Sequence, residues 1–209
     1  MSKELARTVG EIGEVIGVDP SHEMRERASE RCGERANVRI LDGTVTALPL
    51  PNQVADKAVA LQVFEYLHDL PGALGEARRV LRPNGRLVVG DIHWDSVVWH
   101  STDRRRMARV PEAWDGHLAE RCVPALLPSL LRHAGFMLEQ VLPVPVVDAT
   151  LRPGGYAEMM LHRIASYALQ NRGIGADEVN AWQEEQRGLA EEGKFSFALT
   201  HFVITARSA

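Results

Sequence analysis

The sequence predicts an α/β fold in which parallel strands alternate with helices. Through the first two thirds of the chain, short apolar runs typical of buried strands alternate with segments whose apolar residues recur at helical spacing. The chain has 209 residues, of which 45% are hydrophobic and 25% charged, so it is long enough to bury one sizeable core. Without an internal repeat or a linker, we expect a single domain over residues 1–209.

The first two thirds give the order helix, strand, helix, strand, strand, helix, strand. Ser21 is suited to cap the second helix, and Pro71 is suited to begin the third. The sequence Arg-Pro-Asn-Gly at 82–85 predicts a turn before the next strand. The strands are expected at residues 14–19, 38–41, 56–61 and 86–91, and the helices at 3–9, after 21 and at 71–81.

The last third of the chain has a different pattern. A leucine-rich helix begins at Pro124, and a strand is expected from about 136 through 141. Two helical segments follow, at 156–167 and 176–190, before an alternating strand over 195–206. These two helices either form a cap over a pocket or pack against the sheet, and periodicity alone leaves both open.

Charge and composition exclude several classes of protein. The formal net charge is −4 and the pI is near 6.1, which gives no general attraction to nucleic acid, and the run Arg104–Arg106 is typical of a solvated helix face. Cys32 and Cys122 lie far apart, which suits free thiols in a reducing compartment. No segment has the length of a membrane span, no apolar signal core is present at the start, and the histidines lack metal-ligand spacing. We expect a cytoplasmic protein with no metal and no membrane span.

Five segments in a fixed order resemble the class I S-adenosylmethionine-dependent methyltransferases, and more narrowly the methyltransferase type 11 or ubiquinone/menaquinone-biosynthesis group. The resemblance is close to about Asp91 and looser through Ala206. It implies a Rossmann-like sheet with flanking helices, S-adenosyl-L-methionine as cofactor, a cofactor-binding part over 1–92 and a substrate-side and cap part over 93–209. The segments are GEVIGVDPSHEM, VRILDGTVTALPLP, VALQVFEYLHD, ALGEARRVLRPNGRLVV and the Ala-Gly-Phe at 134–136.

The resemblance implies four cofactor-binding residues. Asp19 stands where an acid accepts hydrogen bonds from both ribose hydroxyls, although Asp-Pro-Ser also suits a turn that caps a helix. Thr44 stands where relatives have the Asp that receives the adenine amine, so it would bind without charge assistance, or its hydroxyl only bonds locally. Val45 would offer its backbone amide to the adenine ring. Gln62 would contact the methionine part of the donor.

The glycine-rich loop that relatives place before this acid has no counterpart. Nothing before Asp19 matches Asp-x-Gly-x-Gly-x-Gly, so the first strand of the sheet is expected to be missing together with the loop. A late start or a fragment explains this better than a rearranged fold, because the remaining pattern is regular. A strand edge left open in this way would favour self-association into a homo-oligomer.

Methyl transfer from a sulfonium is a direct displacement that mainly requires alignment of the reacting atoms. His93 follows the strand at 86–91, where relatives bind their acceptor, and would serve as a base oriented by Asp91 or Asp95. It is otherwise a surface or packing residue. Trp94 and Trp99 either wall an apolar or cation-binding site or anchor this segment.

Three functions follow from these patterns. The first is methyl transfer from S-adenosylmethionine to a small-molecule acceptor. The second is a truncated, non-catalytic methyltransferase-like module for binding or assembly, suggested by the missing loop and by Thr44. The third, a nicotinamide-dependent dehydrogenase, shares the acid after a strand but lacks the Gly-x-Gly-x-x-Gly that it requires.

Overall fold

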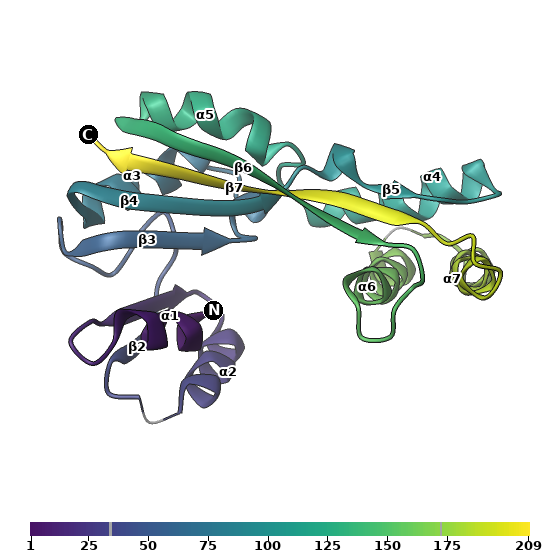
Figure 1. Ribbon diagram of the computed structural model, residues 1–209, viewed down its shortest axis with the longest axis horizontal. Coiled ribbons are helices and arrows are strands. Elements are labelled where there is room, and N and C mark those ends of the chain that lie inside the picture. Colours follow the sequence, from purple (N-terminus) through teal and green to yellow (C-terminus); the bar gives the residue numbers. More distant parts are fainter. Residues whose placement is uncertain (34, 172) are drawn as a thin grey trace.

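A computed structural model describes residues 1–33, 35–171 and 173–209, with the strands arranged in two separate sheets (Figure 1). The smaller sheet consists of the parallel strands β1 (Val15–Asp19) and β2 (Val38–Asp42), whose last residues lie opposite one another. Helices α1 (Ser2–Val9) and α2 (His22–Cys32) pack on this pair. Ser21 caps α2 as predicted, because its hydroxyl accepts the amide of Met24.

The larger sheet has five strands and is mixed. Its order is β3–β4–β7–β5, and β6 also pairs with β7. Strands β3 and β4 are parallel, whereas β7 is antiparallel to β4, β5 and β6. Its strands are β3 (Ala55–Leu61), β4 (Leu81–Ile92), β5 (Val98–Trp99), β6 (Phe136–Asp148) and β7 (Phe197–Ser208).

Strands β1 and β3 each have a partner on one side only. Within the described residues, β1 pairs with β2 alone and β3 with β4 alone, so the two sheets are not joined. This arrangement agrees with the prediction that a strand is missing between them, because both edges keep backbone groups without a ladder partner.

The connection between the sheets is fixed to helix α3 (Leu70–Val80). Arg79 donates hydrogen bonds to the carbonyl oxygens of Leu48 and Leu50, and Glu76 accepts the amide of Leu48 at 2.8 Å. The guanidinium of Arg79 also pairs with Glu76, and the chain from 48 to 52 is therefore held against α3. The residues that follow β2 therefore keep a defined position relative to β3, into which this connection leads.

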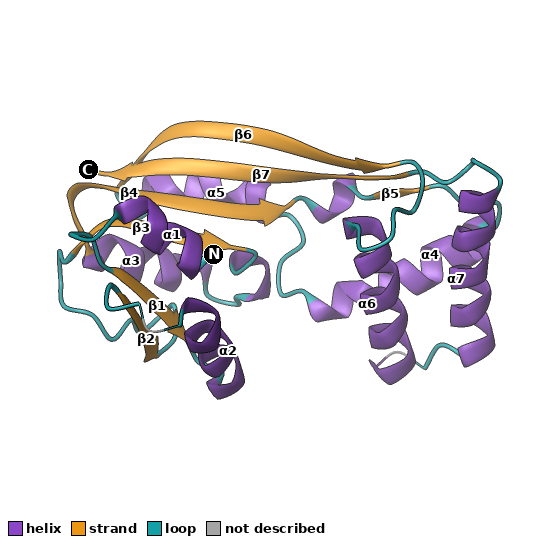
Figure 2. Ribbon diagram, turned by 60° about the horizontal axis from the view of Figure 1, so that its bottom comes forward, coloured by secondary structure: helices purple, strands orange, loops and turns teal. Residues whose placement is uncertain are grey.

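Two hydrophobic cores support the larger sheet. One lies between the sheet and helices α3 and α5 (Val123–His133), where Leu74, Leu81 and Leu131 are fully buried. The other lies at the far end of β7, where α4 (Arg104–Ala113), α6 (Tyr156–Asn171) and α7 (Ala176–Glu191) gather (Figure 2). Helices α6 and α7 therefore pack with α4 on the β5 end of the sheet and build a core of their own.

The element order matches the sequence prediction through β4, with two differences. The turn predicted at 82–85 lies inside β4, where the register with β3 shifts between Ala55 and Lys57 and Asn84 has φ 64°. The segment from 93 to 122 had no predicted element apart from the helix face at Arg104–Arg106, where α4 begins, but it also contains β5 and the short 3-10 helices η2 (Trp94–Ser96) and η3 (Trp114–His117). None of the described helices is long and apolar enough to cross a membrane.

Candidate functional site

Candidate residues lie at the carboxyl ends of four strands, which form two parallel pairs. Asp19 ends β1, Thr44 follows β2, Gln62 follows β3 and His93 follows β4. This edge is where open α/β sheets bind their ligands, because strand ends and the following helix starts present unpaired polar groups there. The two sheets divide the set into an Asp19 and Thr44 pair and a Gln62 and His93 pair.

Asp19 is half-buried, and within the described part of the chain its Oδ2 has no hydrogen-bond partner. Its Oδ1 accepts the amide of Ser21 at 2.8 Å, which closes the turn before α2. Arg25 donates to the carbonyl oxygen of Asp19 and also pairs with Asp42 at 2.8 Å. The turn that the sequence offered as an alternative is thus present, and it leaves Oδ2 for a hydroxyl ligand.

Thr44 and Val45 lie in the turn that leaves β2. The hydroxyl of Thr44 is exposed and lies 3.3 Å from that of Thr46, which is the local contact expected of a threonine at a strand end. The carbonyl of Thr44 accepts the amide of Ala47, so the turn is closed. The side chain of Val45 packs against the core beneath α3, which orients its backbone.

Gln62 has an unusual backbone conformation immediately after β3. Its φ is 51°, in the left-handed region that a non-glycine residue rarely adopts, and its amide donates to the carbonyl of Gly90 at 2.7 Å. The side chain is exposed and lies near the hydroxyl of Tyr156 from α6. This conformation turns the chain sharply into the short helix η1 (Phe64–Tyr66).

Glu65 occupies the centre of that turn and is completely buried. Its Oε2 accepts the indole Nε1 of Trp94 at 2.9 Å, and its backbone carbonyl accepts the amides of Ala119 and Glu120. Burial raises the pKa of Glu65 although the Trp94 hydrogen bond acts in the opposite direction. The turn after β3 is therefore tied to the segment after β4 and to the segment before α5.

Asp91 is the second buried carboxyl group at this edge, with 1% of its surface exposed. The amides of Val63, Phe64 and Glu65 are near enough to attract its charge, although none of them meets hydrogen-bond geometry. Burial, together with the charge of Glu65, raises the pKa of Asp91 to about 8. Asp91 therefore supports the turn after β3 rather than orienting His93 through a hydrogen bond.

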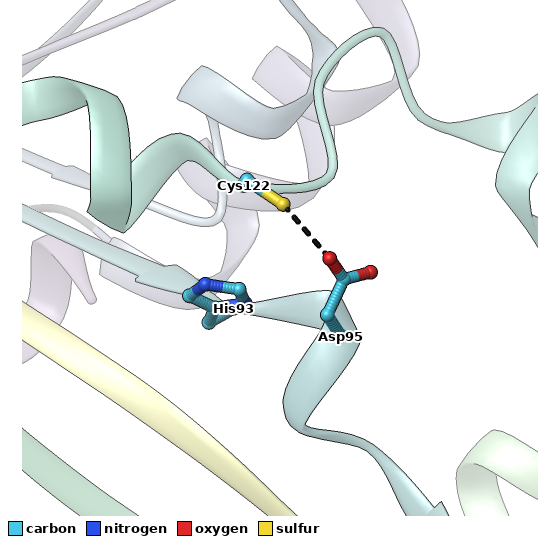
Figure 3. A group of neighbouring side chains, drawn as sticks. All are labelled: His93, Asp95 and Cys122. Atoms are coloured by element: carbon cyan, nitrogen blue, oxygen red, sulfur yellow. Dashed lines mark hydrogen bonds between the residues drawn. The ribbon is translucent and has the colours of Figure 1, made fainter.

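His93 lies beside Asp95 and Cys122, and the side chains of Asp95 and Cys122 point toward each other (Figure 3). The candidate ligand atoms of the three residues lie within 4.8 Å of one another, and Nδ1 of His93 is buried with no described partner. However, the thiol of Cys122 donates to Asp95 at 3.2 Å, and Asp95 also pairs with Arg121 at 2.9 Å. A cation would have to displace both contacts, because Asp95 as placed is already bonded to Cys122 and Arg121.

An aromatic group is formed by four residues, Tyr66, Trp114, His117 and Tyr167. The ring of His117 is 4.3 Å from Trp114, 5.2 Å from Tyr66 and 5.2 Å from Tyr167, measured between centroids. Arg163 of α6 is exposed, and its charge acts on both Tyr66 and His117. Burial and this charge lower the pKa of His117, which keeps the imidazole neutral near pH 7.

The predicted anchoring role of the two tryptophans agrees with their surroundings. Trp94 is 7% exposed and packs on Trp114, while Trp99 packs edge-on against Trp182 and Phe197.

Sequence reasoning missed Glu65, His117, Tyr156 and Arg163 as neighbours of the site. Glu65 was hidden inside a predicted strand-to-helix connection, and the other three come from segments that meet the site only through tertiary packing. The one local signal was Glu65-Tyr66 within a run of apolar residues, where an acid is rarely placed without a buried partner.

Residues 1–89 match the family model described as a methyltransferase domain. An uncharacterised 37.1 kDa protein in transposon TN4556 of Streptomyces fradiae is 32% identical over 211 residues, which cover 98% of this chain and 58% of that protein. The 2-phytyl-1,4-naphtoquinone methyltransferase of Synechococcus elongatus is 33% identical over 92 residues, covering 43% of this chain and 40% of that enzyme. The chain thus spans about half the length of the curated relatives that it matches.

Solved structures share the fold. A proposed methyltransferase from Bacillus halodurans superposes with a TM-score of 0.59 at 16% identity, covering 93% of this chain and 82% of that one. The [4+2]-cyclase SpnF superposes with a TM-score of 0.58 at 20% identity, covering 98% of this chain and 68% of that one. At these identities the likeness concerns the fold alone, and the second example shows that this fold is not restricted to one chemistry.

Proposed function

Because this chain belongs to the methyltransferase domain family through residues 1–89, we propose that it transfers a methyl group from S-adenosyl-L-methionine to a small-molecule acceptor by direct displacement. The observation that carries this proposal is the position of Asp19, Thr44 and Gln62 at the carboxyl ends of β1, β2 and β3. The residues fit the donor: a free carboxylate oxygen, a hydroxyl and an amide are suited to bind ribose, adenine and methionine in this order.

Each donor contact has a specific role. The free Oδ2 of Asp19 would accept a ribose hydroxyl, while Ser21 holds the other oxygen. Thr44 would accept the adenine amine through its exposed hydroxyl, and the packed side chain of Val45 would present its amide to the ring. The exposed side chain of Gln62 would hold the methionine end, since its backbone turn aims it away from the core.

The acceptor would lie between the end of β4 and helix α6. His93, which follows β4, would take the proton that an acceptor releases as the methyl group is transferred. The aromatic group around His117 would stack a planar ring, and Arg163 would attract an acceptor that carries negative charge. A quinone-type or phenolic acceptor suits these groups, and the naphtoquinone methyltransferase among the relatives supports this class.

Further proposals concern partners and location. The net charge of −4 gives no basis for binding nucleic acid, and we propose a cytoplasmic enzyme. Self-association would use the outer edge of β6, which pairs only with β7 within the described residues. Six of its apolar side chains are at least 39% exposed: Met137, Leu138, Val141, Leu142, Val144 and Val147.

One observation favours a second candidate, a non-catalytic methyltransferase-like module for binding or assembly. The donor residues are divided between two sheets whose facing strands β1 and β3 have no second partner within the described chain. A site divided in this way has fewer contacts that fix its geometry, which would weaken donor binding. The fold shared with SpnF leaves room for such a different role.

Calorimetric titration with S-adenosylmethionine tests the proposal. We expect micromolar binding that is lost in Asp19→Ala and weakened in Gln62→Ala, with Asp56→Ala as a control for an acid at the opposite end of β3. Binding should then be followed by methyl transfer to phenolic or quinol acceptors. A folded protein without donor affinity would contradict the proposal and favour the non-catalytic module.

A further inference from the structure

The phenol hydroxyl of Tyr156 is a buried polar group that the fold does not satisfy. Its oxygen is buried and has no hydrogen-bond partner within the described residues. The ring is held by two side chains of β7, since it stacks on Phe197 at 6.3 Å between centroids and meets His201 edge-on at 6.4 Å. Most buried hydroxyls have a partner, because a hydroxyl that loses water without one is destabilising. The hydroxyl of Tyr156 is therefore a candidate for binding a ligand.

The connection between β6 and α6 fixes the position of Tyr156, the first residue of α6. Asp148, the last residue of β6, accepts the amide of Thr150 at 2.9 Å. Glu158, in the first turn of α6, accepts the amide of Gly154 at 2.7 Å. These bonds close the connection, so the ring of Tyr156 is held from the chain as well as by its neighbours on β7.

The sheet register brings Tyr156 to the carboxyl end of β3. His201, against which the ring packs, lies opposite Ile92 on β4. On the other side of β4, the backbone amide of Gln62 donates to the carbonyl of Gly90 at 2.7 Å. The side chain of Gln62 is near the hydroxyl of Tyr156, although the two groups do not meet hydrogen-bond geometry. Two groups that can each donate a hydrogen bond thus lie close together and do not satisfy one another.

The charges around Tyr156 favour an anion. Arg163 lies seven residues further along α6, which places it on the same face of the helix two turns away. It is exposed and forms no ion pair with a described residue, and its charge reaches Tyr156. Glu65 has the opposite effect on an anion, but burial raises the pKa of Glu65 and so favours its uncharged form. A carboxylate, with two acceptor oxygens and a negative charge, suits a hydroxyl and an amide that both donate.

We propose that the hydroxyl of Tyr156 and the side-chain amide of Gln62 together bind the methionine carboxylate of S-adenosyl-L-methionine. This inference rests on the methyl transfer proposed above, in which Gln62 alone holds the methionine end. It makes α6 part of the donor site as well as of the acceptor site. Burial raises the pKa of Tyr156, so its hydroxyl stays protonated and can donate to the carboxylate.

Calorimetry with two ligands tests the role of Tyr156. The ligands are S-adenosylmethionine and decarboxylated S-adenosylmethionine, which keeps the ribose, the sulfonium and the amine but lacks the carboxylate. We expect Tyr156→Phe to lower the affinity for S-adenosylmethionine about tenfold, because a hydrogen bond to a charged group is lost. The same variant should leave the affinity for the decarboxylated ligand unchanged. Asp19→Ala should lower both affinities by the same factor, since both ligands carry the ribose.

Tyr167→Phe is the matched control on the same helix. Tyr167 lies three turns from Tyr156, with its ring 5.2 Å from that of His117, so this variant should change neither affinity. The proposal is overturned if Tyr156→Phe lowers both affinities equally or leaves both unchanged. It is also overturned if the variant only raises the KM of a carboxylated acceptor, because the hydroxyl would then bind the acceptor.

Thermal unfolding without a ligand shows whether the hydroxyl has a partner within the protein. Tyr156→Phe keeps the ring beside Phe197 and removes only the unpaired hydroxyl, so the midpoint should stay equal or rise. A midpoint lowered by more than about 3 °C would show that the fold satisfies this hydroxyl, and would overturn the proposal. Binding of neither ligand by the folded, unaltered protein would contradict methyl transfer as well. Binding that Asp19→Ala weakens and Tyr156→Phe does not would contradict the role of Tyr156 alone.

Discussion

The indole Nε1 of Trp94 donates a 2.9 Å hydrogen bond to Oε2 of Glu65. Trp94 comes from the segment after β4 and Glu65 from the turn after β3, and both side chains are buried. This bond joins the segment that carries Gln62 to the segment that carries His93, since each of these residues lies within three positions of it.

Removing the indole N–H of Trp94 should destabilise the protein. Trp94→Phe keeps most of the apolar surface but leaves another buried oxygen of Glu65 unpartnered, so we expect a loss of about 1–3 kcal/mol in the free energy of unfolding. Urea denaturation followed by circular dichroism measures it. Trp99→Phe is the control, since Nε1 of Trp99 has no partner within the described residues. Equal losses for both variants would show that the hydrogen bond contributes nothing.

Stability should depend on pH through Asp91. Its pKa is raised in the folded protein from 3.8 to about 8, so the folded state binds the proton more tightly than the unfolded state over this range. The free energy of unfolding should therefore fall as pH rises between these values, by at most about 1.4 kcal/mol per pH unit. Denaturation series at pH 5, 6.5, 8 and 9 should show a slope that Asp91→Asn reduces; an equal slope in both proteins would contradict the assignment.

Glu185 should make the α7 end of the fold sensitive to acid. It pairs with Arg106 at 2.8 Å and accepts the amide and hydroxyl of Thr102, each at 2.7 Å. Burial opposes ionisation, but these bonds lower the pKa of Glu185 from 4.5 to about 2. The stabilisation is therefore present above pH 4.5 and is lost as pH falls toward 2.

The variant Glu185→Gln should lose about 2–4 kcal/mol at pH 7, because Arg106 and the surrounding donors keep only part of their partner. Thermal unfolding at pH 7 and pH 3 measures this difference, which should narrow at the lower pH. The exposed neighbour Glu184 provides the control, Glu184→Gln. If Glu185→Gln lowers the free energy of unfolding by the same amount at both pH values, Glu185 is not ionised in the folded protein.

Cys122 should react slowly with alkylating reagents at neutral pH. Burial and the neighbouring Asp95 raise the pKa of its thiol, which reduces the thiolate fraction. Asp95→Asn should lower that pKa and accelerate modification by iodoacetamide several-fold at pH 7.5. Mass spectrometry separates this reaction from that of the buried Cys32, whose rate should not change.

Self-association through β6 has its own test. Sedimentation velocity at rising concentration should show a dimer that is weakened by Leu142→Lys, because a charge on the exposed edge blocks strand pairing. Lys57→Glu, on the open edge strand β3, tests the other sheet edge. If Lys57→Glu weakens the dimer and Leu142→Lys does not, the interface lies at the open edge of β3, as the sequence analysis expected of an unpaired strand edge.

The first half of the fold could be predicted because its signals are local. Ser21, Pro71 and the apolar runs at 38–41 and 56–61 gave elements within one or two residues of those observed, except at 82–85. There, pairing of Ala55 with Leu81 extends β4 across the turn residues, which no local signal records.

The candidate site was only partly predictable. The resemblance to the methyltransferases pointed to Asp19, Thr44, Gln62 and His93 at predicted strand ends, and their ligand roles remain predictions. The contacts of Glu65 with Trp94 and of His117 with Tyr66 join segments 29 and more residues apart. A single sequence carries no record of such pairs.

Strand β7 pairs with β4, β5 and β6, so three strands depend on residues 197–208 for their place in the sheet. During synthesis, β4 and β6 leave the ribosome before that common partner exists. Their apolar side chains and open edges must remain unpaired until β7 has emerged. Assembly of the larger sheet is therefore a late event, and the nascent chain is most exposed to chaperones and aggregation during the interval between β6 and β7.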